Sequence, residues 1–189
     1  MQVEDTAIPG AKILTPRRFG DARGYFSETW NARRMAEAGL ELTFVQDNES
    51  LSVDVGTIRG LHYQAPPFAQ AKLVRAVTGT IRDVIIDVRI GSPAYGTQVA
   101  VTLSEENDQQ LLVPRGCLHG FATLTPNTRV SYKVDNWYDG PSDGSVRWND
   151  PALAIDWGIE EENAVVSDKD AAAPLFNDWT SPFRWEETA

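Results

Sequence analysis

The amino-acid sequence predicts an all-β protein, built as a double-sheet jelly roll or a similar barrel. From Phe44 onward, short runs of β-branched and apolar residues each end at Gly, Pro, Asn or Asp, as strands commonly do. Turn signals such as Gly91-Ser92-Pro93 separate these runs at the spacing typical of sandwiches and barrels. Little of the remaining chain has the composition of a helix.

The expected elements follow in chain order. Residues 32–39 are rich in helix formers and stop at Gly39, which predicts one short helix with a C-terminal cap. Strands are expected at 72–77, 81–90, 97–103 and 111–114. Within 83–89 the apolar residues run together before alternating with charge, so this strand should be covered on one face and partly on the other. After Trp157 the chain should wrap the barrel as loops and short helices.

Composition favours one domain over residues 1–189 and limits the possible partners. The 17 basic and 27 acidic residues give a formal charge of −10, which opposes general attraction to nucleic acids or anionic membranes. No stretch approaches the roughly 18 apolar residues of a membrane span, and Glu4 and Asp5 stand where a secretory signal would be basic. We therefore expect a cytoplasmic protein. Cys117 is the single cysteine and is expected to pack rather than to react.

The chain has two histidines, and each lies in a conspicuous motif. Imidazole titrates near neutral pH, so these positions are the first candidates for proton transfer or metal binding. In the motif 59–64, Arg59 and His62 would project to opposite sides of an ideal strand, which suggests a turn leading into a strand. In the motif 114–121, Pro114 and Gly116 form a turn that presents His119 at the start of the next strand, although His119 could equally be a hydrogen-bonded core residue.

A metal centre is the main alternative for these histidines. A 2-His-1-carboxylate site, as in a metal-dependent cupin oxygenase, needs His62, His119 and one further acidic ligand. The region around His62 lacks the His-x-His pair that metal-binding barrels usually carry. Lys72 opens an apolar strand, so its ammonium group either points into the barrel or reaches the rim with a packed stem.

Several other side chains suit an anionic or aromatic ligand. Arginine offers paired donors to phosphate oxygens, and Asn and Gln add neutral donors. Tyr132 and Tyr138 are six residues apart and would face the same side of a strand, with core packing as the ordinary alternative. The candidate donors are Arg23, Gln46, Asn48, Arg59 and Lys169, and Asp47 lies between the two amides in the segment 46–48.

Together, these motifs resemble the dTDP-4-dehydrorhamnose 3,5-epimerase family, collinearly from Ile8 to Trp185. The segments that carry the resemblance are 21–28, 44–48, 59–64, 70–74, 83–89 and 114–121. The resemblance implies a cupin-type jelly-roll barrel with a few short peripheral helices, a homodimer, and no metal or other cofactor. It also implies a substrate that carries a 4-keto sugar on thymidine diphosphate.

The same resemblance implies roles for individual residues. A 4-keto group acidifies the neighbouring C–H bonds, so inversion needs a base, an acid on the opposite face and stabilisation of the enolate between them. His62 matches the base, Tyr132 the acid, and Lys72 the cation at the enolate oxygen, with His119 near the same sugar. Asp170 matches the residue that orients His62, and Asp168 is the second choice.

For the nucleotide, Tyr138 matches the aromatic residue that stacks on thymine, and Asp143 stands where many relatives have glutamate. Residues near Arg23 to Glu28 come from the neighbouring subunit in this family. The remaining implied binding residues are Arg23, Phe26, Glu28, Gln46, Asp47, Asn48, Arg59 and Lys169.

The resulting hypothesis is a cofactor-independent 3,5-epimerase of dTDP-4-dehydro-6-deoxy-D-glucose, in the route to dTDP-L-rhamnose. Three alternatives stay open: an epimerase of only one of the two centres, a non-catalytic sugar-nucleotide-binding barrel, and the metal-dependent oxygenase.

Overall fold

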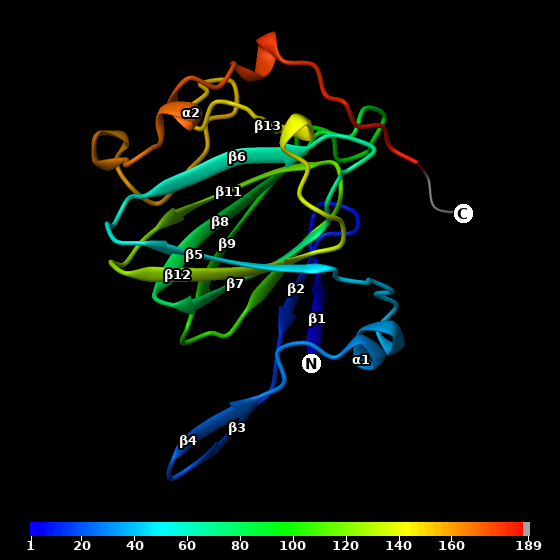
Figure 1. Cartoon of the computed structure of the whole chain (residues 1–189), viewed down its shortest axis with the longest axis vertical. Helices are drawn as coiled ribbons and strands as arrows, with labels where there is room; N and C mark the ends of the chain where they lie inside the picture. The colour runs from blue at the N-terminus through cyan, green and yellow to red at the C-terminus, as the bar shows by residue number, and fades with distance from the viewer. Residues whose placement is uncertain (187–189) are drawn as a thin grey trace.

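Two antiparallel sheets face each other in the structure, a computed structural model that describes residues 1–186 (Figure 1). The six-stranded sheet contains, in spatial order, β1 (Gln2–Asp5), β2 (Lys12–Thr15), β10 (Gln110–Val113), β7 (Lys72–Thr78), β12 (Thr128–Val134) and β5 (Gln46–Ser52). The five-stranded sheet contains β13 (Asp143–Ser145), β6 (Ile58–Gln64), β11 (Cys117–Thr123), β8 (Thr80–Asp87) and β9 (Gln98–Ser104). The all-β prediction is confirmed, and the four predicted strands are present with small shifts at their ends.

The main core lies between the two sheets, and a second core covers the outer face of the five-stranded sheet. Along β8, Ile81 and Ile85 point inward, whereas Val84 and Ile86 point outward and pack with Trp157. The expectation that 83–89 is only partly covered on its second face is therefore wrong, because all seven residues are buried. Each fully buried aliphatic side chain contributes about 1.5–3 kcal/mol, so this second layer adds substantially to stability.

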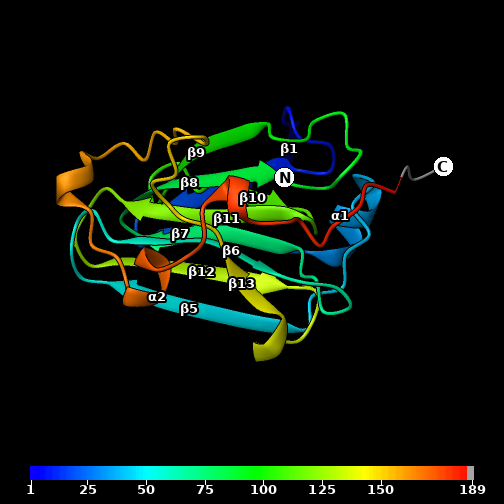
Figure 2. The ribbon, with the colours of Figure 1, turned by 90° about the horizontal axis from the view of Figure 1, so that it is seen from above.

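The chain after β13 forms the second layer, as predicted. It contains the short helices η2 (Glu161–Asn163), α2 (Asp168–Ala171) and η3 (Phe176–Asp178), which follow η1 (Gly140–Ser142). These segments lie over the five-stranded sheet in Figure 1 and cross it when seen from above in Figure 2. Two isolated bridges join this segment to the barrel, one between Thr57 and Val165 and one between Ile90 and Arg184. This layer brings α2 next to β6.

The predicted helix near the N-terminus is α1 (Ala32–Glu37). Asn31 caps it by accepting the Arg34 N–H at 3.2 Å, and Gly39 follows the helix with a φ of +78°, in the left-handed region that favours glycine. Met35 is buried beneath it, against Leu14, Leu73 and Leu112 on the outer face of the six-stranded sheet. None of the helices within residues 1–186 has the length and apolar character needed to cross a bilayer.

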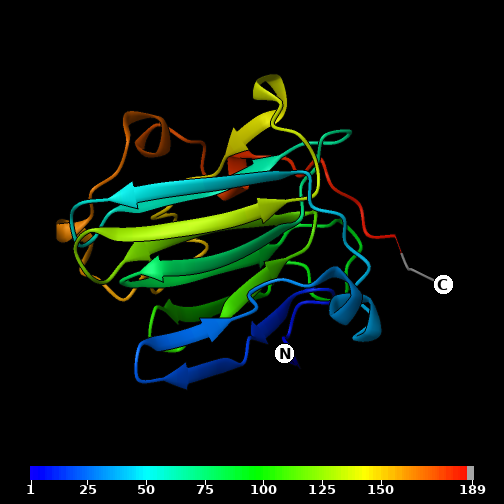
Figure 3. The ribbon, with the colours of Figure 1, turned by 60° about the horizontal axis from the view of Figure 1, so that its bottom comes forward.

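A two-stranded hairpin, β3 (Arg18–Asp21) and β4 (Gly24–Ser27), projects away from the barrel (Figure 1). Figure 3 shows β5 in cyan, β12 in yellow-green and β7 in green side by side, with the blue hairpin beyond them. Phe19, Tyr25 and Phe26 are 49%, 60% and 70% exposed on this hairpin. Its base is held by Arg18, whose Nε donates to Asp108 Oδ2 at 3.0 Å.

Candidate functional site

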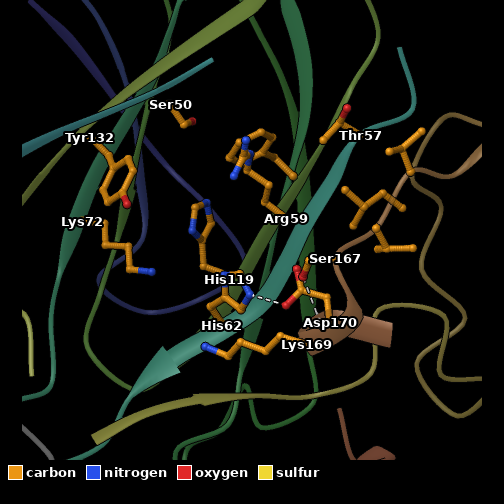
Figure 4. Close-up of a pocket in the computed structure, with 14 residues that line it drawn as sticks. Ser50, Thr57, Arg59, His62, Lys72, His119, Tyr132, Ser167, Lys169 and Asp170 are labelled. Carbon is orange, nitrogen blue, oxygen red and sulfur yellow. Dashed lines mark hydrogen bonds and ion pairs between the residues drawn. The ribbon is translucent and has the colours of Figure 1, made fainter. Parts of the chain in front are cut away.

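A pocket of about 490 Å³ opens between the two sheets, next to α2. The five-stranded sheet contributes Arg59, His62 and His119 to its wall, and the six-stranded sheet contributes Lys72 and Tyr132 (Figure 4). A neighbouring hollow of about 300 Å³ shares His62, Lys72 and Tyr132 with it. The structure therefore brings these three predicted side chains to the walls of both hollows.

A β-bulge in β6 explains how Arg59 and His62 reach the same pocket. His62 pairs with His119 and Arg59 pairs with Phe121, so three steps along β6 match two steps along β11. The extra residue reverses the normal alternation of side chains, which places both residues on one face. The expectation of a turn at this point is wrong, because 58–64 is a strand throughout and the bulge provides the change of direction.

Glycine is required at position 60 within this bulge. Its φ of +141° is rarely adopted by residues with a side chain, and a Cβ there would lie 2.5 Å from Gly120 Cα and 2.9 Å from the His119 carbonyl oxygen. The close approach of the two strands also aims the Gly60 N–H at Asp170, whose Oδ2 accepts it at 3.3 Å. Gly60, the glycine of the 59–64 motif, thus helps to position the carboxylate of Asp170.

His62 and Asp170 form a hydrogen-bonded pair across β6 and α2. The distance from His62 Nε2 to Asp170 Oδ1 is 2.6 Å, and Asp170 is 3% exposed (Figure 4). Ser167 caps α2 by accepting the Asp170 N–H at 3.2 Å, which fixes the start of this short helix. Burial acts to raise the pKa of Asp170, but the hydrogen bonds from His62 and Gly60 outweigh it, so the pKa is lowered. Asp170, and not the exposed Asp168, is the residue placed at His62.

Lys72 and Tyr132 project from the opposite wall. Tyr132 pairs with Val74 in the six-stranded sheet, so Lys72 and Tyr132 lie diagonally on its inner face. Among residues 1–186, no carboxylate lies within ion-pair distance of Lys72 Nζ. Burial lowers the pKa of Lys72, although the charges of Asp83 and Asp143 oppose this effect. Burial raises the pKa of Tyr132, which keeps its phenol protonated.

His119 has a carboxylate partner that the sequence did not reveal. Its Nε2 lies 2.7 Å from Oδ1 of Asp83, a residue of β8 that is 0% exposed. Burial lowers the pKa of His119, and the nearby Lys72 and His62 add to this effect, while Asp83 opposes it. The available signal was the alternation of Ile81, Asp83 and Ile85, which places a carboxylate on the inward face of an apolar strand.

The neighbouring hollow collects several of the predicted nucleotide contacts. Gln46 and Asn48 point into it from β5, and Gln46 Oε1 accepts the Tyr138 N–H at 3.2 Å. Tyr138 is 62% exposed, so a face of its ring is open to a ligand. Asp143 at the start of β13 forms an ion pair with Lys169 of α2, and this bond raises the pKa of Lys169.

Four predicted binding residues do not reach this space within one chain. Strand alternation turns Asp47 to the outer face of β5, where it pairs with Lys133 instead. Arg23, Phe26 and Glu28 belong to the projecting hairpin or its base, with Arg23 paired to Asp21 and Glu28 to Arg34. Phe26 is 70% exposed and belongs to β4, in the hairpin that projects away from the barrel (Figure 1).

The two histidines are held apart by separate aspartates. His62 is bonded to Asp170 and His119 to Asp83. Over the residues that the structure describes, no three His, Cys, Asp or Glu side chains gather closely enough to hold a metal ion. Cys117 is buried as a free thiol, and burial raises its pKa to about 12, in keeping with a packing role.

Comparison with known proteins gives consistent matches over most of the chain. A family model described as dTDP-4-dehydrorhamnose 3,5-epimerase matches residues 5–178. A dTDP-4-dehydrorhamnose 3,5-epimerase of Sinorhizobium fredii is 48% identical over 178 residues, which cover 92% of this chain and 89% of the relative.

Two solved structures are similar to this chain in both sequence and fold. The dTDP-4-dehydrorhamnose 3,5-epimerase of Bacillus anthracis, with TDP and pyrophosphate bound, is 47% identical with a TM-score of 0.89, over 93% of this chain and 99% of that one. The dTDP-6-deoxy-D-glucose-3,5-epimerase of Legionella pneumophila, in complex with dTDP-4-keto-L-rhamnose, is 41% identical with a TM-score of 0.92, over 98% of both chains. The fold is therefore a cupin-type jelly roll, as expected.

Proposed function

The chain belongs to the dTDP-4-dehydrorhamnose 3,5-epimerase family and is an isomerase, and from this premise we propose which residues carry its reaction. The reaction converts dTDP-4-dehydro-6-deoxy-D-glucose to dTDP-4-dehydro-L-rhamnose by removing and returning protons at C3 and C5. One observation carries the assignment: His62 and Tyr132 enter one pocket from opposite sheets, with Lys72 on its wall. This is the arrangement that inversion of a carbon next to a ketone requires.

His62 is the proposed base. Its Nε2 is held by Asp170 at 2.6 Å, which leaves the other ring nitrogen to take a proton from the sugar. When His62 becomes an imidazolium ion, the ionised and buried Asp170 stabilises the new charge. The lowered pKa of Asp170 means that this carboxylate stays charged at neutral pH.

Lys72 and His119 are the proposed partners of the carbonyl oxygen. Loss of the proton leaves an enolate, whose negative charge concentrates on this oxygen. An ammonium group in a partly enclosed pocket stabilises that charge far more strongly than it would in water. His119 lies directly opposite His62 in the strand pairing, which supports a role for it beside the same sugar ring.

Tyr132 is the proposed acid. It comes from the six-stranded sheet, whereas His62 comes from the other, so a sugar between them would meet the base and the acid on different faces. Its raised pKa keeps the phenol neutral and able to donate until the carbanion forms. Return of a proton from this face inverts the centre.

The nucleotide is proposed to occupy the neighbouring hollow and its rim. Arg59 and Lys169 supply positive charge for the diphosphate, which a chain of net charge −10 can only offer locally. Gln46 and Asn48 add neutral donors, and the exposed ring of Tyr138 is available to stack on thymine. Asp143 contributes through its contact with Lys169. The outward position of Asp47 leaves its side chain outside this set.

A homodimer is proposed to complete the site with Arg23, Phe26 and Glu28. An isolated two-stranded hairpin is marginally stable in water, and this one exposes three large aromatic rings. Insertion of the hairpin against the pocket of a second copy would cover the rings and bring Arg23, whose side chain is 88% exposed, to the diphosphate. Analytical ultracentrifugation of the protein and of an Arg23→Ala variant tests this arrangement: a monomeric wild-type protein contradicts it.

Product analysis tests the activity itself. The keto sugar is generated enzymatically and followed by NMR with a downstream 4-keto reductase present, so that dTDP-L-rhamnose accumulates only if both centres invert. His62→Ala should abolish product while retaining thymidine diphosphate binding. A product inverted at only one centre would instead identify a single-centre epimerase, and a wild-type protein that binds but never turns over would identify a silent binding barrel.

A further inference from the structure

Asp83 is a buried carboxylate beside the pocket that has no part in the roles proposed above. It is 0% exposed, on the inward face of β8 between Ile81 and Ile85. Its Oδ1 lies 2.7 Å from His119 Nε2, and its Oδ2 has no hydrogen-bond partner among the described residues. A buried carboxylate with one unpartnered oxygen costs free energy, so its place in an otherwise apolar strand needs a reason.

We propose that Asp83 is a positioning residue for the epimerisation: it fixes the ring of His119 and supplies the negative charge that keeps Lys72 an ammonium ion inside the barrel. The inference rests on the proposed function, because it assigns Asp83 to the two residues expected at the carbonyl oxygen. Asp83 does not line the pocket, so it acts through these neighbours and not on the substrate.

The first half of the role is the orientation of His119. This ring is 7% exposed, and burial lowers its pKa, so it is neutral at pH 7. A neutral imidazole carries one ring proton. Asp83 favours the tautomer with this proton on Nε2, because its carboxylate accepts the Nε2–H hydrogen bond of His119. Nδ1 is then an acceptor, and it can receive a hydrogen bond from a sugar hydroxyl or from Lys72.

The second half concerns the charge of Lys72. The titratable groups around it are Asp83 on β8, Asp143 on β13, Tyr132 on β12, the two histidines on β6 and β11, and Arg59, Lys169 and Asp170 at the pocket wall. Burial favours the neutral amine, and only Asp83 and Asp143 raise the pKa of Lys72 against it.

These two carboxylates are not equivalent. Asp143 already forms an ion pair with Lys169, whereas within residues 1–186 the one hydrogen-bond partner of Asp83 is the neutral ring of His119. Of these two carboxylates, Asp83 is therefore the one whose negative charge has no Lys or Arg partner in the part of the chain that the structure describes. A carboxylate that bonds His119 and does not line the pocket can hold Lys72 charged while its ammonium group stays available to the enolate oxygen.

The test is the dependence of kcat on pH for Asp83→Asn, with Asp87→Asn as the matched control. Asparagine keeps the size of the side chain and can still accept from His119 Nε2, so the variant removes mainly the charge. Asp87 is also 0% exposed on the inward face of β8, but it pairs with Arg89 at 2.7 Å, away from the pocket. We expect the alkaline limb of kcat to move to lower pH by about one unit in Asp83→Asn, the low end of the effect of a nearby opposite charge, and not to move in Asp87→Asn.

A second measurement reads Lys72 without relying on activity. NMR titration of ¹³C-labelled lysine, with the Lys72 signal assigned by its loss in Lys72→Arg, should show a lower midpoint in Asp83→Asn than in the wild-type protein. If the asparagine variant does not fold, Asp83→Ser is measured in the same way. An unchanged alkaline limb and an unchanged Lys72 midpoint would overturn the inference. Wild-type protein that shows no solvent exchange into the keto sugar, while the Lys72 midpoint still shifts, would instead overturn the proposed function.

Discussion

Asp170→Asn gives the sharpest test of how His62 is held, because an amide cannot satisfy both hydrogen bonds of the carboxylate. Asp170 accepts from His62 through Oδ1 at 2.6 Å and from the Gly60 N–H through Oδ2 at 3.3 Å. An amide has one acceptor oxygen and one NH₂ group, so one of these two donors must face another donor. If the NH₂ group faces His62, the imidazole proton moves to the nitrogen that should receive the substrate's proton.

The size of the effect follows from the lost charge. Asp170 stabilises the imidazolium ion that forms in the reaction, and a hydrogen bond to a charged group contributes about 1.5–3 kcal/mol. At about 1.4 kcal/mol per tenfold in rate, the loss of kcat is about 10- to 150-fold. Because Asp170 is 3% exposed, water cannot easily replace its charge, and we expect the upper part of this range.

The assay is kcat with the keto sugar and an excess of 4-keto reductase, together with the affinity for thymidine diphosphate. Asp168→Asn is the matched control, since Asp168 lies on the same helix but is exposed. We expect Asp170→Asn to lose kcat and to bind the nucleotide normally, and Asp168→Asn to change neither. An Asp170→Asn enzyme with the kcat of the wild type would show that the charge of Asp170 does not support His62 as the base.

The same carboxylate predicts a part of the acid sensitivity of the fold. The pKa of Asp170 is lower in the folded chain than its unfolded value of about 3.9. Its contribution to stability is therefore present above about pH 4 and is lost as the pH falls through the lowered pKa. Chemical denaturation between pH 2 and 6 should show a shallower loss of unfolding free energy in Asp170→Asn, and an identical slope in both proteins would contradict this.

Three further results are expected. Tyr132→Phe keeps the packing but loses the proton donor, so kcat should fall about 10²-fold or more, while a fall in nucleotide affinity instead would point to a binding role. Gly60→Ala should lower Tm more than Gly24→Ala. Both glycines have a positive φ, but only at Gly60 would the new Cβ meet backbone, 2.5 Å from Gly120 Cα. Equal losses of Tm would argue against the close approach of β6 and β11 at this point. Cys117, with its pKa raised to about 12, should resist alkylation at pH 8 until the chain unfolds, and rapid labelling of the native protein would show that it is accessible.

Local patterns predicted the fold class well because they depend on near neighbours in the chain. The helix ending before Gly39 and the strands at 72–78 and 98–104 follow directly from composition and turn residues. The coverage of 83–89 was underestimated, since the layer that buries its second face comes from Trp148, Trp157 and Phe183, far along the chain. The alternation of residues along one strand does not show which distant segments of the chain will bury its outer face.

In the candidate site, too, features set by near neighbours in the chain were predictable, and contacts between distant segments were not. The motifs identified His62, Lys72, Tyr132 and Asp170, and the structure places all four around one pocket. The bulge at Gly60 depends on the register between β6 and β11, so the sequence of one strand could not reveal it. The partner of His119 is 36 residues away in the chain, and only the pairing of β8 with β11 brings Asp83 to it.

Deuterium uptake is the most direct test of whether one base and one acid work on opposite faces of the same sugar. The keto sugar is incubated with the enzyme in D₂O, and the product is examined by NMR at each ring position. We expect solvent deuterium at both C3 and C5 with the wild-type protein and at neither with His62→Ala. Turnover without deuterium at these carbons, or continued exchange at both in His62→Ala, would contradict it.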